Sequence, residues 1–182
     1  ENFSQFQTHR TVISSECRKN MKSYLDVEYG STELQKIDIY PANKFSPVHL
    51  FFHGGYWRTQ DKKNFAFLAR TLVPQGVTTV IVNYDLCPKV SLDEVVESSR
   101  NAIEWTYKNI EKYNGNPNRI SVSGNSAGAH LCSMLLATDW KNRGLPQKII
   151  SGAVLFSGIY DPEPTRWIPV NEDIRLTAET AA

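Results

Sequence analysis

The sequence predicts a single α/β domain over residues 1–182, with a mainly parallel sheet and helices on both of its faces. Three observations support this prediction. Short apolar runs recur along the chain, amphipathic runs with helical spacing lie between them, and a glycine-flanked serine motif joins one apolar run to the next helix. Strands that alternate with helices in this way indicate right-handed crossovers and parallel neighbours.

Four apolar runs are the predicted buried strands. They cover residues 48–52, 78–82, 120–123 and 152–156. Two earlier runs, 24–29 and 34–40, alternate in polarity and end at Gly30 and Pro41. We expect these two runs to form an antiparallel pair with one face in water.

Apolar residues at helical spacing predict the helices that connect the strands. One helix is expected near 65–72, with Gly76 after it as a stop, and a longer one from Leu92 to Ile110. Ser91 and Glu94 have the spacing of a capping box at the start of the longer helix. Gly115 is the predicted stop of this longer helix. A third helix is expected over 126–140. The first 21 residues are expected to form surface helix and loop.

Composition excludes several classes of function. The formal net charge is only +1, which gives no electrostatic basis for binding nucleic acid or an anionic membrane. Three widely spaced cysteines, among them Cys132 in an apolar helical run, indicate a reducing compartment and no disulfide framework. There is no metal-ligand spacing, signal peptide or membrane-length apolar run. We therefore expect a cytoplasmic protein without a metal.

The motif Gly124-Asn125-Ser126-Ala127-Gly128 is the strongest indication of chemistry. It lies between an apolar strand and an apolar helix, the context of the nucleophile elbow of α/β hydrolases. There, a sharp turn lifts the serine hydroxyl above the sheet, and the helix N-terminus favours developing negative charge. The bare pattern arises by chance in roughly one chain in twenty of this length, but the strand and helix around it remove most such accidents. We assign Ser126 as the nucleophile.

A second motif, His53-Gly54-Gly55, follows the first buried strand. Acyl transfer needs N–H donors aimed at the oxyanion, and loss of one costs about 3–4 kcal/mol of barrier. Amides of residues without a Cβ can approach a carbonyl closely. His-Gly-Gly alone could be a simple loop turn, but two such motifs at the carboxyl edge of parallel strands point to a common crevice. Gly54, Gly55 and Ala127 are the predicted oxyanion donors.

Together, His-Gly-Gly-x-Trp and Gly-x-Ser-Ala-Gly-Ala-His resemble the arylformamidase (kynurenine formamidase) family, close relatives of the hormone-sensitive-lipase-like esterases. The similarity extends from about residue 24 onward, over segments 82–84, 87–88, 135–140, 155–161 and 171–181. It implies an α/β-hydrolase fold and a cytosolic, metal-free enzyme that hydrolyses N-formyl-L-kynurenine to formate and kynurenine in tryptophan breakdown. It also implies that Tyr56 and Trp57 wall an aromatic substrate, although such a pair is as often simple packing.

One part of the expected machinery is missing from the sequence. Enzymes of this fold carry Ser, then Asp or Glu, then His in chain order, and no histidine follows His130. We expect a structural role for His130, because it lies four residues after Ser126 on the same helix. We expect His53 to shape the oxyanion loop, with a role as base as the poorer alternative, and His9 and His49 to be structural or exposed. Asp161 and Asp173 are improbable acids.

The chain is therefore expected to be C-terminally incomplete, with the acid and histidine beyond Ala182. Such a fragment would be nearly inactive and would expose the edge of its last strand.

Three functions remain open on the sequence alone. The first is an amidase that acts on N-formyl-L-kynurenine through a formyl-serine intermediate. The second is a carboxylesterase with the same machinery, and the third is a non-catalytic binding module that retains the fold. The expected partner is a small-molecule substrate, and a homodimer is left open.

Overall fold

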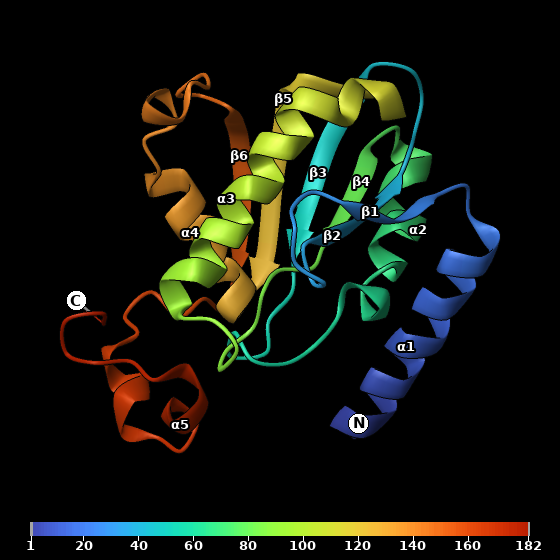
Figure 1. Ribbon diagram of the computed structural model, residues 1–182. Helices are drawn as coiled ribbons and strands as arrows, with labels where there is room; N and C mark the ends of the chain where they lie inside the picture. The colour runs from blue at the N-terminus through green and yellow to red at the C-terminus, as the bar shows by residue number, and fades with distance from the viewer. Residues whose placement is uncertain (1, 182) are drawn as a thin grey trace.

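The computed structural model describes residues 2–181 and contains one six-stranded sheet with the strand order β1-β2-β4-β3-β5-β6 (Figure 1). β1 pairs antiparallel with β2, and β2 antiparallel with β4, while β4, β3, β5 and β6 run parallel. The mainly parallel sheet predicted from the sequence is confirmed. The strands are β1 (Tyr24–Glu28), β2 (Lys36–Tyr40), β3 (Ser46–Phe52), β4 (Thr78–Val82), β5 (Gly115–Asn125) and β6 (Ile150–Phe156).

Helices cover both faces of this sheet, as predicted (Figure 1). The α-helices are α1 (Phe3–Asn20), α2 (Phe67–Leu72), α3 (Leu92–Asn109), α4 (Ala127–Ala137) and α5 (Asn171–Ile174). Helices α3 and α4 enclose the larger hydrophobic cluster on one face, and α1 and α2 enclose a smaller one on the other. The predicted capping box at the start of α3 is present, with the Ser91 and Glu94 side chains each bonded to the other's backbone N–H.

The parallel strands place the two predicted motifs next to each other. β3 lies between β4 and β5, and Phe52 at the end of β3 pairs with Gly124 of β5. His53 and Ser126 each follow within two residues of this pair. The carboxyl ends of β3 and β5 therefore meet at one edge, where ligands of open α/β sheets bind.

Two sequence-based expectations about the elements are wrong. The predicted antiparallel pairing of β1 with β2 is confirmed, but the pair does not share one wet face, because β2 is buried on both sides while β1 is largely exposed. The buried polar residue of β2, Asp38, forms ion pairs with Arg18 of α1 and with Lys62. Helix α4 ends at Ala137 rather than near residue 140, since its C-cap Thr138 is already extended.

β6 is the edge strand of the parallel part of the sheet, and its Val154 and Phe156 side chains are 51% and 56% exposed. The chain after β6, with the short helix η5 (Glu163–Trp167) and α5, lies at the end of the sheet where β3 and β5 terminate (Figure 1). No helix in the described part of the chain combines the length and the apolar character needed to cross a membrane.

Candidate active site

Ser126 occupies a sharp strand-to-helix turn between β5 and α4. Its backbone angles are φ 54° and ψ −119°, a region that residues with a Cβ rarely adopt. A Cβ at Gly128 would lie 2.0 Å from the carbonyl oxygen of Phe52, and one at Gly124 would lie 2.3 Å from the backbone of Gly128. The two flanking glycines are therefore required by the close approach of α4 to the ends of β3 and β5.

The Ser126 hydroxyl is free to act at this position. The residue is half-buried, and its backbone N–H is held by the Phe156 carbonyl at 2.9 Å. Its Oγ has no hydrogen-bond partner among residues 2–181. Helix α4 begins at the next residue, so its N-terminal amides and dipole face this end of the sheet.

Residues 53–59, here called the oxyanion loop, have an unusual backbone conformation. Gly55, Tyr56 and Trp57 have φ of 114°, 49° and 55°, three consecutive positive values. The Gly55 carbonyl accepts from the N–H groups of Arg58 and Thr59, both at 3.1 Å, which closes the loop on itself. A Cβ at Gly54 would lie 3.2 Å from the Ser126 Cβ. The loop thus lies directly against the predicted nucleophile.

The three predicted oxyanion donors are not equivalent. The Gly54 N–H donates to Asn125 Oδ1 at 3.2 Å, whereas the N–H groups of Gly55 and Ala127 have no acceptor within residues 2–181. An oxyanion site requires unpaired amides, and here one follows Ser126 directly while the other lies on the loop that packs against Ser126 through Gly54. Asn125 was not predicted from the sequence, because it occupies a variable position of the motif.

His53 lies beneath the oxyanion loop. Its ring is 1% exposed and stacks on Tyr84 with centroids 4.4 Å apart. Nδ1 lies 2.8 Å from the Gly54 carbonyl oxygen, which can only accept, so Nδ1 carries the proton. Burial lowers the pKa of His53 to about 4. This arrangement fits the expected role of His53 in shaping the loop. It does not support the alternative role as base, because the ring is buried and its Nδ1 proton is donated to the Gly54 carbonyl. Tyr84 also donates to the His53 carbonyl; it belongs to the 82–84 segment of the family resemblance, but the sequence predicted no role for it.

Trp57 and Tyr56 occupy different environments. Trp57 is fully buried, and its Nε1–H donates to His130 Nδ1 of α4 at 3.2 Å. It therefore lies under the loop and does not wall an open pocket, so the expectation that it contacts substrate does not fit this structure. Tyr56 is 40% exposed and remains a predicted substrate contact.

The other predicted residues lie away from Ser126 or are engaged elsewhere. His9 is exposed on α1, and His49 in β3 bonds to Ser121 and Ser123. Asp161 is exposed in the segment after β6, and Asp173 forms an ion pair with Arg58 of the oxyanion loop. In residues 2–181, no group of three or more His, Cys, Asp or Glu side chains could hold a metal ion.

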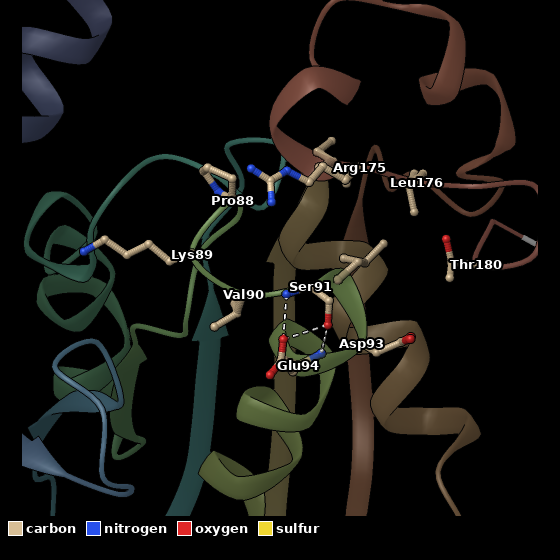
Figure 2. A pocket seen from close by; sticks show the side chains of 11 residues that line it. Pro88, Lys89, Val90, Ser91, Asp93, Glu94, Arg175, Leu176 and Thr180 are labelled. Carbon is tan, nitrogen blue, oxygen red and sulfur yellow. Dashed lines mark hydrogen bonds between the residues drawn. The ribbon is translucent and has the colours of Figure 1, made fainter.

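A separate cavity of about 260 Å³ lies between the start of α3 and the C-terminal segment. Figure 2 shows the capping-box bonds of Ser91 and Glu94 on one side, with Arg175, Leu176 and Thr180 on the other. None of the predicted site residues lines this cavity. The candidate active site is therefore the junction of the oxyanion loop and the Ser126 turn.

Comparison with known proteins gives a consistent result. The family model BD-FAE matches residues 37–153, a span that includes both motifs. Kynurenine formamidases from Danio rerio and Salmo salar are each 37% identical, over 90% and 96% of this chain. The chain spans 55% and 60% of the length of these two relatives.

Among solved structures, a candidate thioesterase from Silicibacter sp. TM1040 superposes with a TM-score of 0.86 and 26% identity. The match covers all of this chain and 68% of that protein. The full sheet, its helices and the segment after β6 therefore have a counterpart in a solved structure.

Proposed function

Because the chain belongs to the BD-FAE family and has the α/β-hydrolase fold, we propose that the protein is a serine hydrolase that acts through an acyl-serine intermediate. The resemblance to arylformamidases, inferred from the motifs, is confirmed by the 37% identity to two kynurenine formamidases. The observation that carries the proposal is the pair of unpaired amides, Gly55 and Ala127, beside the Ser126 turn.

The chemistry follows from this geometry. The Ser126 Oγ attacks a carbonyl carbon, its proton passes to a base, and the carbonyl oxygen becomes an oxyanion that the Gly55 and Ala127 N–H groups stabilise. Collapse of this intermediate expels the leaving group, which takes up the proton. Water then attacks the acyl-serine and regenerates the hydroxyl. None of the described residues bonds to Oγ as the base.

For the substrate, we propose N-formyl-L-kynurenine. Attack on its formyl carbon gives a formyl-serine and releases kynurenine as the arylamine, and water then releases formate. The two relatives named for this activity support the assignment, as does half-exposed Tyr56, which places an aromatic ring on the loop next to the amides.

A direct test uses the protein encoded by its natural transcript. We expect turnover of N-formyl-L-kynurenine to exceed that of p-nitrophenyl esters, and Ser126→Ala to abolish it. Ester hydrolysis without formamidase turnover would refute the substrate assignment and leave the serine hydrolase.

The second candidate is a carboxylesterase, favoured by the 33% identity, over 60% of this chain, to an esterase from Mycobacterium tuberculosis. A fluorophosphonate probe separates both enzymes from a non-catalytic binding module. Labelling that Ser126→Ala removes supports an enzyme, and absence of labelling in the wild type supports the module.

A further inference from the structure

We propose that His130 is a positioning residue that fixes the oxyanion loop against the nucleophile helix by accepting the indole N–H of Trp57. The Trp57 Nε1 and His130 Nδ1 atoms are 3.2 Å apart, and the two rings meet edge to face with centroids 5.1 Å apart. Both side chains are at least nine-tenths buried. The contact joins residues 73 positions apart in the sequence.

The protonation state of His130 follows from its partner. An indole N–H can only donate, so His130 Nδ1 must be unprotonated and the ring neutral. Burial, which lowers the pKa of His130 to about 4, keeps the ring in this form at neutral pH. His130 is therefore suited to accept a hydrogen bond.

The backbone conformation of the oxyanion loop must be held in place by contacts of this kind. Tyr56 and Trp57 both have positive φ without being glycine, and each such conformation is costly unless surrounding structure imposes it. The Trp57 carbonyl is held by the Cys87 N–H at 2.8 Å, and its indole is held by His130. These contacts fix Trp57 in the left-handed conformation and so determine where the preceding residues lie.

The contact also links the segments that carry the two unpaired amides, Ala127 on α4 and Gly55 on the oxyanion loop. Ala127 and His130 are one turn apart on α4, whereas Gly55 and Trp57 are two residues apart on the loop. Gly54, on the other side of Gly55, is held by Asn125 next to the nucleophile. The unpaired Gly55 amide is therefore held from both sides by the segment that carries Ser126. A small displacement of this amide would weaken transition-state stabilisation more than substrate binding.

The expected effect on catalysis rests on the proposed hydrolase function. The experiment tests that function and the Trp57–His130 contact separately. The variants are His130→Leu, which cannot accept a hydrogen bond, His130→Gln, which can, and Trp57→Phe, which removes the donor. Leu135→Val, at another buried position of α4, is the matched control for loss of packing. Turnover of N-formyl-L-kynurenine and p-nitrophenyl acetate, fluorophosphonate labelling and the ¹⁵N-indole signals of the four tryptophans are measured.

We expect His130→Leu and Trp57→Phe each to lower kcat and the labelling rate by about ten- to a hundredfold with little change in KM. The double variant should be no worse than either single variant. His130→Gln should restore most of kcat, and Leu135→Val should keep it. In the spectrum, His130→Leu should move the indole signal that Trp57→Phe removes.

Two results would overturn the proposal. One is wild-type kcat in His130→Leu when the indole signal shows that the hydrogen bond is lost. The other is an indole signal that His130→Leu leaves unmoved. If the wild type neither turns over substrate nor labels, the hydrolase function fails, and the indole signal alone then decides the contact. If His130→Leu does not fold, the comparison of His130→Gln with Trp57→Phe tests the same contact, because only the first retains the bond.

Discussion

At the scale of single residues, the site depends on positions where a side chain would collide with backbone. Gly128 shows this most clearly, because its Cα approaches the end of β3 so closely that a methyl group has no room. Helix propensity alone would favour alanine over glycine by about 1 kcal/mol within α4. The steric demand of the turn outweighs that preference.

We therefore predict that Gly128→Ala destabilises the protein by at least about 2 kcal/mol, since the added Cβ would lie 2.0 Å from the Phe52 carbonyl oxygen. Gly152→Ala is the matched control, because a Cβ there meets nothing within 4 Å. Urea unfolding of both variants measures the difference. Equal stabilities would show that the elbow can relax and that this crowding is not what selects glycine.

Asn125 gives a second prediction at this scale. Its Oδ1 accepts the Gly54 N–H, so Asn125→Leu would leave that donor unsatisfied and the loop less well held. An unsatisfied buried donor costs about 1–3 kcal/mol, and we expect kcat to fall about tenfold or more. Asn125→Asp retains an acceptor oxygen and should lose less. Steady-state kinetics of the two variants test this expectation, and an equal loss in both would contradict a role for the acceptor.

At the scale of elements, the sequence predicted those features that depend on local chemistry. The start of α3 was predictable because Ser91 and Glu94 satisfy the first amides of the helix without help from the rest of the fold. The burial of β2 could not be predicted, because it depends on charged side chains that come from other parts of the chain. Asp38 has no exposure, and its partners Arg18 and Lys62 come from α1 and from the segment after the oxyanion loop.

This buried cluster is testable through Lys62. Its Nζ donates to Asp38 at 2.7 Å and also pairs with Asp26, and the residue is only 3% exposed. Removing Lys62 leaves the buried Asp38 carboxylate with Arg18 as its remaining partner, and loss of one hydrogen bond to a buried charged group costs about 1.5–3 kcal/mol. We predict such a loss for Lys62→Met in urea unfolding.

The matched control is Lys63→Met. The Lys63 side chain is 63% exposed, and its pair with Asp61 spans 3.8 Å. Its replacement should change the free energy of unfolding by no more than about 0.5 kcal/mol. If Lys62→Met were as mild as Lys63→Met, the cluster would not stabilise β2.

At the scale of the whole molecule, each motif was recognisable by itself, whereas the contacts that join them were not. Gly-x-Ser-x-Gly and His-Gly-Gly-x-Trp are local patterns whose spacing reflects the turn each must make. The hydrogen bonds from Gly54 to Asn125 and from Trp57 to His130 join the oxyanion loop, which follows β3, to β5 and α4. They exist only because the parallel register places Phe52 beside Gly124, which no local pattern specifies.

The same assembly makes overall stability dependent on pH. Burial lowers the pKa of both His53 and His130 to about 4, from the ordinary histidine value of 6.5. Between these two pH values the unfolded chain binds protons that the folded protein excludes. The contribution of these histidines to the free energy of unfolding is therefore fully present above about pH 6.5 and is lost as the pH falls toward 4. Each histidine should account for about 3 kcal/mol of this loss.

Urea unfolding between pH 7.5 and 4.5 tests this expectation. Carboxylates also titrate toward the acid end of this range, so the informative quantity is the difference between wild type and variant. His130→Gln has no titrating ring and should lose its own share of the histidine contribution to the slope, while His53 and His49, whose pKa burial also lowers, retain theirs. His9→Gln, at an exposed position on α1, is the matched control. If His130→Gln lost stability as steeply as the wild type, His130 would not be held neutral beneath the loop. The hydrogen bond that we assign to its Nδ1 would then lack its basis.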